Sequence, residues 1–209
     1  NTDIAVSKET VQIFVEGGAV KDMVGRQVIG VSTKCVTPDI SVDFTGDTTA
    51  PELDIFRLDL DKGELHLGFL ETAKLQSIKP ETIVLSNAAD ITDGNTVKYQ
   101  LTGGTATTVG SQDSAFVTIK LSSDDLNKIK DMAALAVSQG TTFISFSNEL
   151  AVDMADNKIV ALTTGKRAAA FTADSTDPEI VGVLFDVNVG KLYLDMSETV
   201  DPTSGKPEF

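Results

Sequence analysis

Residues 47–73, DTTAPELDIFRLDLDKGELHLGFLETA, occur a second time at residues 174–200 as DSTDPEIVGVLFDVNVGKLYLDMSETV. Pro51 in the first copy aligns with Pro178 in the second, and the same offset holds along the whole stretch. A unit of this length is an ordinary size for a domain. The sequence therefore predicts a tandem repeat with a period of about 127 residues.

A further partial copy lies at the beginning of the chain. Residues 10–33 align with residues 141–164 at an offset of 131, and Phe44 aligns with Phe171 at an offset of 127. The earlier copy therefore contains four extra residues between about 34 and 43, and loops are where repeats accept insertions.

Three segments follow from these offsets. We predict that residues 1–46 are the C-terminal half of a preceding repeat, that 47–173 form one complete repeat, and that 174–209 are the N-terminal strands of a following repeat. Counterparts of residues 83–131 are present in neither end segment. Each end is therefore expected to be completed by chain outside this sequence or by another molecule.

Short runs of alternating apolar and polar residues, separated by turn residues, are typical of an antiparallel β-sandwich. Asp61-Lys62-Gly63 is predicted to be a hairpin turn with Gly in the left-handed position. Strands are predicted at 53–60, 64–70, 82–86, 96–101, 115–121, 141–147, 158–162 and 167–171. The predicted inward-facing residues are Leu65, Leu67, Phe69, Val117, Ile119, Ile144 and Phe146.

One segment departs from the β pattern. Apolar residues recur at helical spacing within 122–136, and Ser122 stands in the position of an N-cap. We therefore predict one short helix per repeat, at about 124–132, covering one end of the sandwich. The Gly- and Thr-rich residues 103–113 are predicted to be a long exposed loop.

The composition limits the partners and the chemistry. Lys and Arg number 17 against 31 Asp and Glu, and the net charge of −14 disfavours binding of nucleic acid. A single cysteine, Cys35, and a single histidine, His66, cannot form an intrachain disulfide or a zinc cluster. No apolar run is as long as the roughly 18 residues that suggest a membrane span. Nucleophile elbows, phosphate-binding loops and metalloprotease motifs are absent from the sequence, so we do not expect an enzyme.

Short motifs recur at the predicted boundaries. Asp-x-Thr-x-Pro occurs at 47–51 and at 174–178, Met-Ser-Glu-Thr-Val ends a predicted strand at 196–200, and Asp-Met-Ala-Asp-Asn forms a predicted turn at 153–157. These motifs resemble those of the bacterial Ig-like repeats of surface-layer proteins and adhesins. Asp156 stands where that family usually has Gly, and the unit is longer than the family's roughly one hundred residues.

The resemblance implies an all-β fold of tandem Ig-like antiparallel β-sandwiches in an extracellular or cell-surface protein. Such a repeat would serve as a structural part of a filament, stalk or adhesin, with neighbouring repeats or further copies of the same chain as its partners. The alternative is an accessory ligand- or carbohydrate-binding module of a secreted protein. That role favours exposed aromatic residues on a flat face, and this chain has no Trp and only two Tyr.

Acidic residues cluster at both predicted boundaries, where their mutual repulsion would be relieved by a cation such as Ca²⁺. Neither an EF-hand nor another established calcium spacing is present, and ordinary solvated surface is the alternative. The candidate calcium ligands are Asp47, Glu52, Asp54, Asp174, Asp177 and Glu179. The remaining junction and turn positions are Pro51, Pro178, Asp153, Asp156 and Asn157, the last three in an Asx-type turn or around a cation.

Two glutamates stand at equivalent strand ends. Glu71 in the first copy corresponds to Glu198 in the second, and each is followed by Thr. We expect their side chains to hold the next loop through backbone amides, with a ligand role as the alternative. His66 alternates with buried leucines and is expected on the solvent face, without an acid/base partner.

Overall fold

The computed structural model describes residues 14–30 and 45–200. Cys35, Phe44 and the predicted insertion between about 34 and 43 lie outside the described residues. The chain divides into two units, which are described separately. The first comprises Asn1–Thr49 with Met154–Asn157, and the second comprises Ala50–Asp153 with Lys158–Phe209.

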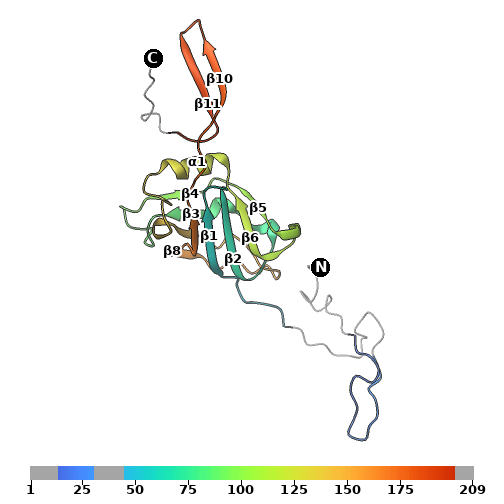
Figure 1. The fold of residues 1–209 in the computed structure, drawn as a ribbon. Helices are drawn as coiled ribbons and strands as arrows, with labels where there is room; N and C mark the ends of the chain where they lie inside the picture. Colours follow the sequence, from blue (N-terminus) through green and yellow to red (C-terminus); the bar gives the residue numbers. More distant parts are fainter. Residues whose placement is uncertain (1–13, 31–44, 201–209) are drawn as a thin grey trace. The chain divides into compact units, whose positions relative to one another are not determined.

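A five-stranded sheet forms one layer of the second unit (Figure 1). The order of its strands is β5-β6-β2-β1-β9, and every neighbouring pair is antiparallel except β1 and β9, which are parallel. Its strands are β1 (Leu53–Asp59), β2 (Glu64–Ala73), β5 (Thr105–Thr107), β6 (Ser114–Lys120) and β9 (Ala170–Thr172).

A four-stranded antiparallel sheet forms the other layer, in the order β4-β3-β7-β8. Its strands are β3 (Ile83–Ser86), β4 (Lys98–Gln100), β7 (Phe143–Phe146) and β8 (Leu162–Arg167). Four short 3-10 turns lie in the connections: η1 (Leu75–Ser77), η2 (Pro80–Thr82), η3 (Val109–Ser111) and η4 (Gln139–Thr141).

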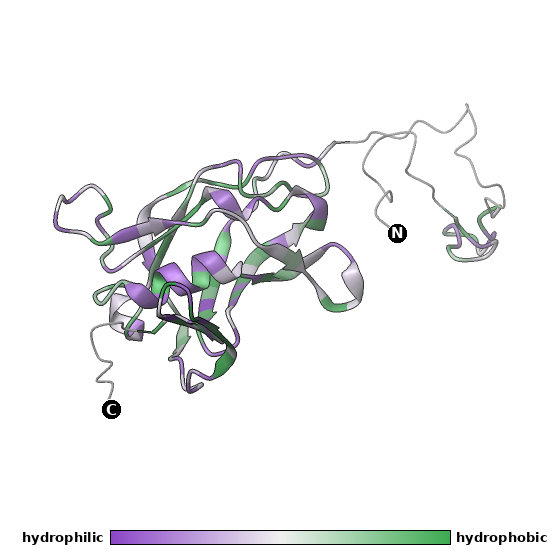
Figure 2. Ribbon diagram, turned by 90° about the horizontal axis from the view of Figure 1, so that it is seen from above, coloured by the Kyte–Doolittle hydropathy of each residue, from purple (hydrophilic) through white to green (hydrophobic). Residues whose placement is uncertain are grey.

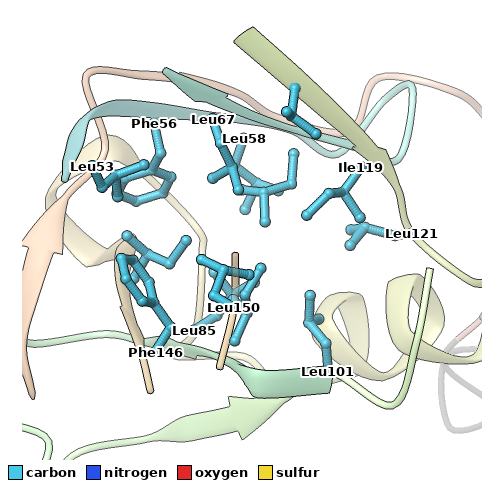
Figure 3. Close-up of a cluster of buried hydrophobic side chains, with 14 of the residues drawn as sticks. Leu53, Phe56, Leu58, Leu67, Leu85, Leu101, Ile119, Leu121, Phe146 and Leu150 are labelled. Carbon is cyan, nitrogen blue, oxygen red and sulfur yellow. The ribbon is translucent and has the colours of Figure 1, made fainter. Parts of the chain in front are cut away.

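The hydrophobic core lies between the two sheets. Phe56 and Leu67 of one sheet face Phe146 of the other (Figure 3), and hydrophobic and hydrophilic residues alternate along the chain (Figure 2). All seven residues predicted to point inward are buried, so this prediction is confirmed. The coarse prediction of an all-β fold built from packed sheets is also confirmed.

The strand predictions were wrong in three places. A uniformly antiparallel sandwich was predicted, but β9 pairs in parallel with β1. The predicted loop at 103–113 contains the edge strand β5, which pairs with β6 through backbone hydrogen bonds. The strand predicted at 158–162 lies later in the chain, since β8 begins at Leu162. The residues before it are irregular: Lys158 pairs with Val152 at an isolated bridge, and Ile159 is buried without belonging to a strand.

Helix α1 (Ser123–Asp131) confirms the predicted helix within one residue at each end. Ser122 is its N-cap, with its side-chain oxygen 3.1 Å from the amide nitrogen of Asp125. The buried carboxylate of Asp125 accepts hydrogen bonds from the Tyr99 hydroxyl at 2.8 Å and from the Thr102 amide and hydroxyl at 3.0 and 2.9 Å. Burial alone would raise the pKa of Asp125, but these hydrogen bonds outweigh it and lower the pKa.

A separate two-stranded sheet is formed by β10 (Ile180–Asp186) and β11 (Lys191–Met196) (Figure 1). Its pairing repeats that of β1 and β2: Phe56 lies opposite Leu67 in the first hairpin, and Val183 lies opposite Leu194 in the second. Every other pair, and the bulge near the start of each hairpin, corresponds at the same offset, the one that aligns the two sequence copies. The exposures differ, since Phe56 and Leu67 are 0% and 2% exposed whereas Val183 and Leu194 are 64% and 47% exposed.

Residues 14–30 contain a small antiparallel turn with a counterpart in the sandwich. Lys21 forms an isolated bridge with Gln27, and Val152 forms one with Lys158, which is 131 positions further along for both residues. The backbone geometry of the first copy therefore follows the alignment made from the sequence.

Candidate functional site

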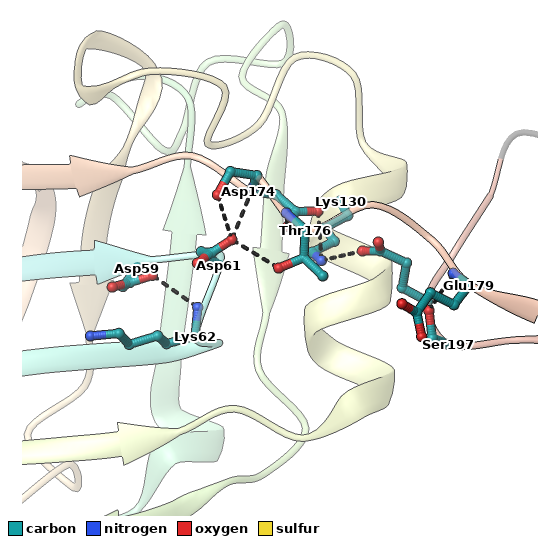
Figure 4. A network of polar contacts seen from close by, with 10 residues as sticks. Asp59, Asp61, Lys62, Lys130, Asp174, Thr176, Glu179 and Ser197 are labelled. Carbon is teal, nitrogen blue, oxygen red and sulfur yellow. Dashed lines mark hydrogen bonds and ion pairs between the residues drawn. The ribbon is translucent and has the colours of Figure 1, made fainter. Parts of the chain in front are cut away.

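The segment between β9 and β10 is anchored by the turn that joins β1 to β2 (Figure 4). The Oδ1 atom of Asp61 accepts hydrogen bonds from the Ser175 amide at 3.0 Å, the Ser175 hydroxyl at 2.8 Å and the Thr176 hydroxyl at 3.1 Å. These bonds, that of the Ser175 side chain foremost, hold the pKa of Asp61 below its usual value. The turn that closes one hairpin thus positions the segment leading to the next.

A lysine from helix α1 joins the same segment from another side. The Nζ atom of Lys130 lies 2.7 Å from Asp174 Oδ2 and 2.7 Å from Glu198 Oε2. Burial would lower the pKa of Lys130, but hydrogen bonds to Asp174 and Glu198 raise it. One ammonium group therefore connects the helix, the segment before β10 and the residues after β11.

The predicted calcium ligands occupy different settings. Asp174 lies against the Lys130 ammonium, so the positive charge beside it is a protein side chain. Asp177 and Glu179 are exposed, and the Glu179 amide donates to the Ser197 hydroxyl at 2.8 Å. Calcium binding at this boundary remains a prediction.

The first boundary shows the same kind of local turn. Asp47 Oδ1 accepts the Thr49 amide at 2.9 Å, and Glu52 and Asp54 are exposed. Pro51 is buried, and its carbonyl accepts the Val160 amide at 2.9 Å. Pro178 at the second boundary is exposed.

The predicted closing turn has a left-handed residue. Asp156 has a φ of 68°, and Gly25, its counterpart in the first copy, has a φ of 86°. Glycine adopts this region without strain, whereas aspartate is one of the few other residues that tolerate it. Asn157 donates its side-chain amide to the Asp47 carbonyl at 3.1 Å, and Asp153 is buried.

The outer face of the five-stranded sheet carries a hollow of about 380 Å³. Gly68 is buried in its floor beneath Ile55 and Phe116, since an added Cβ would lie 2.9 Å from Ile55 Cγ1 and 3.3 Å from Phe116 Cε1. Phe116 is 69% exposed. The hollow therefore presents to solvent an aromatic ring that packs against the backbone of a glycine.

Polar groups line the remainder of this hollow. His66 Nδ1 lies 3.0 Å from the Thr118 hydroxyl, and His66 Nε2 lies 3.6 Å from a carboxylate oxygen of Glu64. The prediction that His66 has no acid/base partner was therefore wrong, because its neighbour at position i−2 lies on the same face of the strand. Arg57, from β1, is exposed and also lines the hollow.

No family model, curated protein or solved structure matches this chain. Among the described residues, none of the helices has the length and apolarity that crossing a membrane requires. Function is therefore inferred from the chain's own internal correspondences and from the geometry of its junction and hollow.

Sequence reasoning identified Asp174 and Glu198 but missed their partner Lys130. It placed Asp61 in a hairpin turn but missed its hydrogen bonds to Ser175 and Thr176. The signal for Lys130 was its place near the C-terminus of the predicted helix, where cations are favourable and where the helix covers the sandwich end. Exposed Phe116 carried a signal too, since it alternates with buried Val117 and Ile119 in a predicted strand.

Proposed function

We propose that the chain is a structural repeat of an extracellular or cell-surface filament, stalk or adhesin, in which Ig-like sandwiches follow one another at the period of the sequence repeat. The correspondence between the β1–β2 and β10–β11 hairpins carries this proposal. Both hairpins have the same register, the same bulge and a turn glycine in the left-handed region, with φ of 63° at Gly63 and 61° at Gly190. A second hairpin with all these features supports the beginning of a second unit.

The uncovered apolar side chains of β10 and β11 support the same proposal. A two-stranded hairpin alone is marginally stable in water, and a contiguous apolar surface usually marks an interface. In the first hairpin, β6 pairs with β2, β9 pairs with β1, and the second sheet covers the inner face. The partners that fit β10–β11 are therefore equivalent strands, from a neighbouring repeat of the same protein or from another copy.

The anchored segment between β9 and β10 supports a role in reach and stiffness. Asp61 fixes it through three hydrogen bonds and Lys130 through one ion pair, to Asp174, while a second ion pair joins Lys130 to Glu198 after β11. A connection held by side chains from both a strand turn and a helix restricts the directions in which a following unit can point. Such restriction is what a stalk requires.

The proposal is tested by supplying the missing strands. In a chain made of residues 1–200 followed directly by residues 74–173, the join keeps the register, because residue 200 corresponds to residue 73. We expect a second sandwich to form and hydrogen exchange at Leu192 and Leu194 to slow to the rates of Leu65 and Leu67. The control is the same extended chain with Leu194→Asp, which should leave the hairpin unprotected. Unchanged exchange in the extended chain would refute the repeat assignment.

A second candidate function, an accessory carbohydrate-binding module, is favoured by one observation. The exposed ring of Phe116 lies in the hollow on a sheet face, which is the arrangement that such a module uses.

A further inference from the structure

We propose that the hollow around Arg57 and Phe116 binds an acidic sugar, a pyranose that carries a carboxylate. The residues that form it all belong to the sandwich, so this inference does not rest on the repeat proposal. Its volume of about 380 Å³ is within the range of small-ligand sites, and its apolar lining with a few polar groups is the usual composition of such sites.

The apolar end of the hollow fits the carbon-bound face of a sugar ring. Phe116 and Ile55 lie close over Gly68, and the absence of a side chain at Gly68 lets both pack against its backbone. Aromatic rings combine a large apolar area with few rotatable bonds, so they provide a preorganised platform. A pyranose placed on Phe116 would cover a ring that is otherwise 69% exposed.

The charge requirement comes from Arg57. Within the described part of the chain, its guanidinium has no hydrogen bond or ion pair, although the protein carries a net charge of −14. Guanidinium and carboxylate groups form paired hydrogen bonds with matching geometry. Arg57 and Ile55 are neighbours on one face of β1 and so lie about 7 Å apart along the strand. That spacing suits a carboxylate and a ring belonging to one sugar.

The surrounding polar groups favour a sugar over an aromatic acid. His66 and the Thr118 hydroxyl offer hydrogen-bonding groups beside the ring position, and the hollow remains open to water on one side. A ligand with hydroxyls around its ring can form hydrogen bonds with the protein on one side and with water on the other. Asp59 lies beyond Arg57 in the direction of the turn, and its charge directs the ligand carboxylate toward the Phe116 end.

The equivalent hairpin lacks these features. Leu184 holds the position of Arg57 in β10, and Asp195 holds the position of Gly68 in β11. The same hairpin geometry therefore forms without the guanidinium and without the glycine. The hollow is a property of this unit and is not needed for the fold.

The test is a titration of the full chain with trigalacturonate, followed by amide chemical shifts, with the neutral galactose trimer as the matched ligand. We expect shifts in β1, β2 and β6 with trigalacturonate, and affinity at least about tenfold weaker in Arg57→Met. Phe116→Ala should weaken binding as well. Arg167→Met, which removes an exposed arginine from the other sheet, is the control for net charge and should bind as the wild type does.

Three outcomes would each overturn the inference. They are the absence of localised shifts in the wild type, equal binding of the neutral trimer, and equal weakening of binding by Arg57→Met and Arg167→Met. Thermal melting of each variant separates loss of binding from loss of folding. A failure here would leave the extended-chain experiment and the repeat proposal unaffected.

Discussion

The β1–β2 and β10–β11 hairpins have the same register and turn but opposite environments. In the first, Leu65 and Leu67 are buried beneath a second sheet, whereas their counterparts Leu192 and Leu194 are exposed. Local sequence is therefore sufficient to specify the hairpin, including its bulge and its left-handed glycine. Burial is a separate event that depends on strands distant in sequence, and the free energy that stabilises the fold comes mainly from that event.

The largest expected difference in stability is between substitutions of two equivalent leucines, Leu67 and Leu194. Leu67→Ala should lower the free energy of unfolding by about 2–5 kcal/mol, because it removes buried methyl groups and leaves a cavity. Leu194→Ala should change it by less than about 0.5 kcal/mol, because the side chain is already in solvent. Urea unfolding of both variants measures the two changes in the free energy of unfolding. Equal losses would mean that β10–β11 is covered in solution.

A second change tests what holds helix α1 to strand β4 and the residues that follow it. Asp125→Asn should cost about 2–3 kcal/mol, since the Tyr99 and Thr102 donors lose a charged acceptor in a buried position. Burial, and then the hydrogen bond to Asp125, raise the pKa of Tyr99 to about 12, so its hydroxyl stays a donor at neutral pH. Asp124→Asn, an exposed neighbour in the same helix, is the control and should have little effect.

The Asp125 effect should depend on pH in a defined direction. Its pKa is lowered in the folded state, so its contribution is fully present above the unfolded value near 3.8 and is lost as pH falls through the lower folded value. The stability difference between wild type and Asp125→Asn should therefore narrow below about pH 4. A difference that stays constant down to pH 2 would contradict the assigned hydrogen bonds.

The turn glycines Gly63 and Gly190 provide a matched pair of substitutions, for which we expect a smaller loss of stability than for Asp125→Asn. Gly63→Ala should cost about 1–2 kcal/mol, because alanine is strained at positive φ, and its Cβ would also lie 2.9 Å from Leu126 Cδ2. Gly190→Ala has the same backbone strain, but its Cβ would meet nothing within 4 Å, and its hairpin is outside the sandwich. Thermal melting of the sandwich should respond to the first substitution alone.

The smallest effect is expected at the junction. Lys130→Met should weaken the attachment of β10–β11 by about 1 kcal/mol, since the ion pairs are partly exposed to solvent. Burial would raise the pKa of Asp174, but the hydrogen bond from Lys130 contributes to lowering it, so that pKa should rise in the variant. Hydrogen exchange of residues 174–179 measures the attachment of β10–β11, and a carboxyl titration by NMR measures the pKa of Asp174. Lys128→Met, from a lysine on the same helix with a different partner, is the control.

Much of the fold was predictable because apolar and polar residues alternate strongly along its core strands. Val117 and Ile119 specify β6, and Ser122 marks the start of the helix. Strand β5 was not predictable in this way, because Thr105–Thr107 has little apolar alternation and becomes a strand by pairing with β6. The parallel pairing of β1 and β9 joins residues more than one hundred positions apart, and neither segment encodes its partner.

The sites were less predictable than the fold. Carboxylates such as Asp174 are visible as a cluster in the sequence, but the cation that meets them depends on how the helix packs, which spacing alone does not specify. The hollow needs Arg57, Gly68 and Phe116 from three adjacent strands, and their order in the sheet was unknown.

The parallel contact between β1 and β9 has a mechanical consequence. The first and last strands of the sandwich run side by side in the same direction, joined by hydrogen bonds from the Leu60 amide to Thr172 at 3.0 Å and from the Ala169 amide to Phe56 at 2.8 Å. A pull applied before β1 and after β9 would draw these strands past each other lengthwise. Their hydrogen bonds would then bear the load together instead of opening one at a time. This pair of strands would therefore resist unfolding of the sandwich under tension.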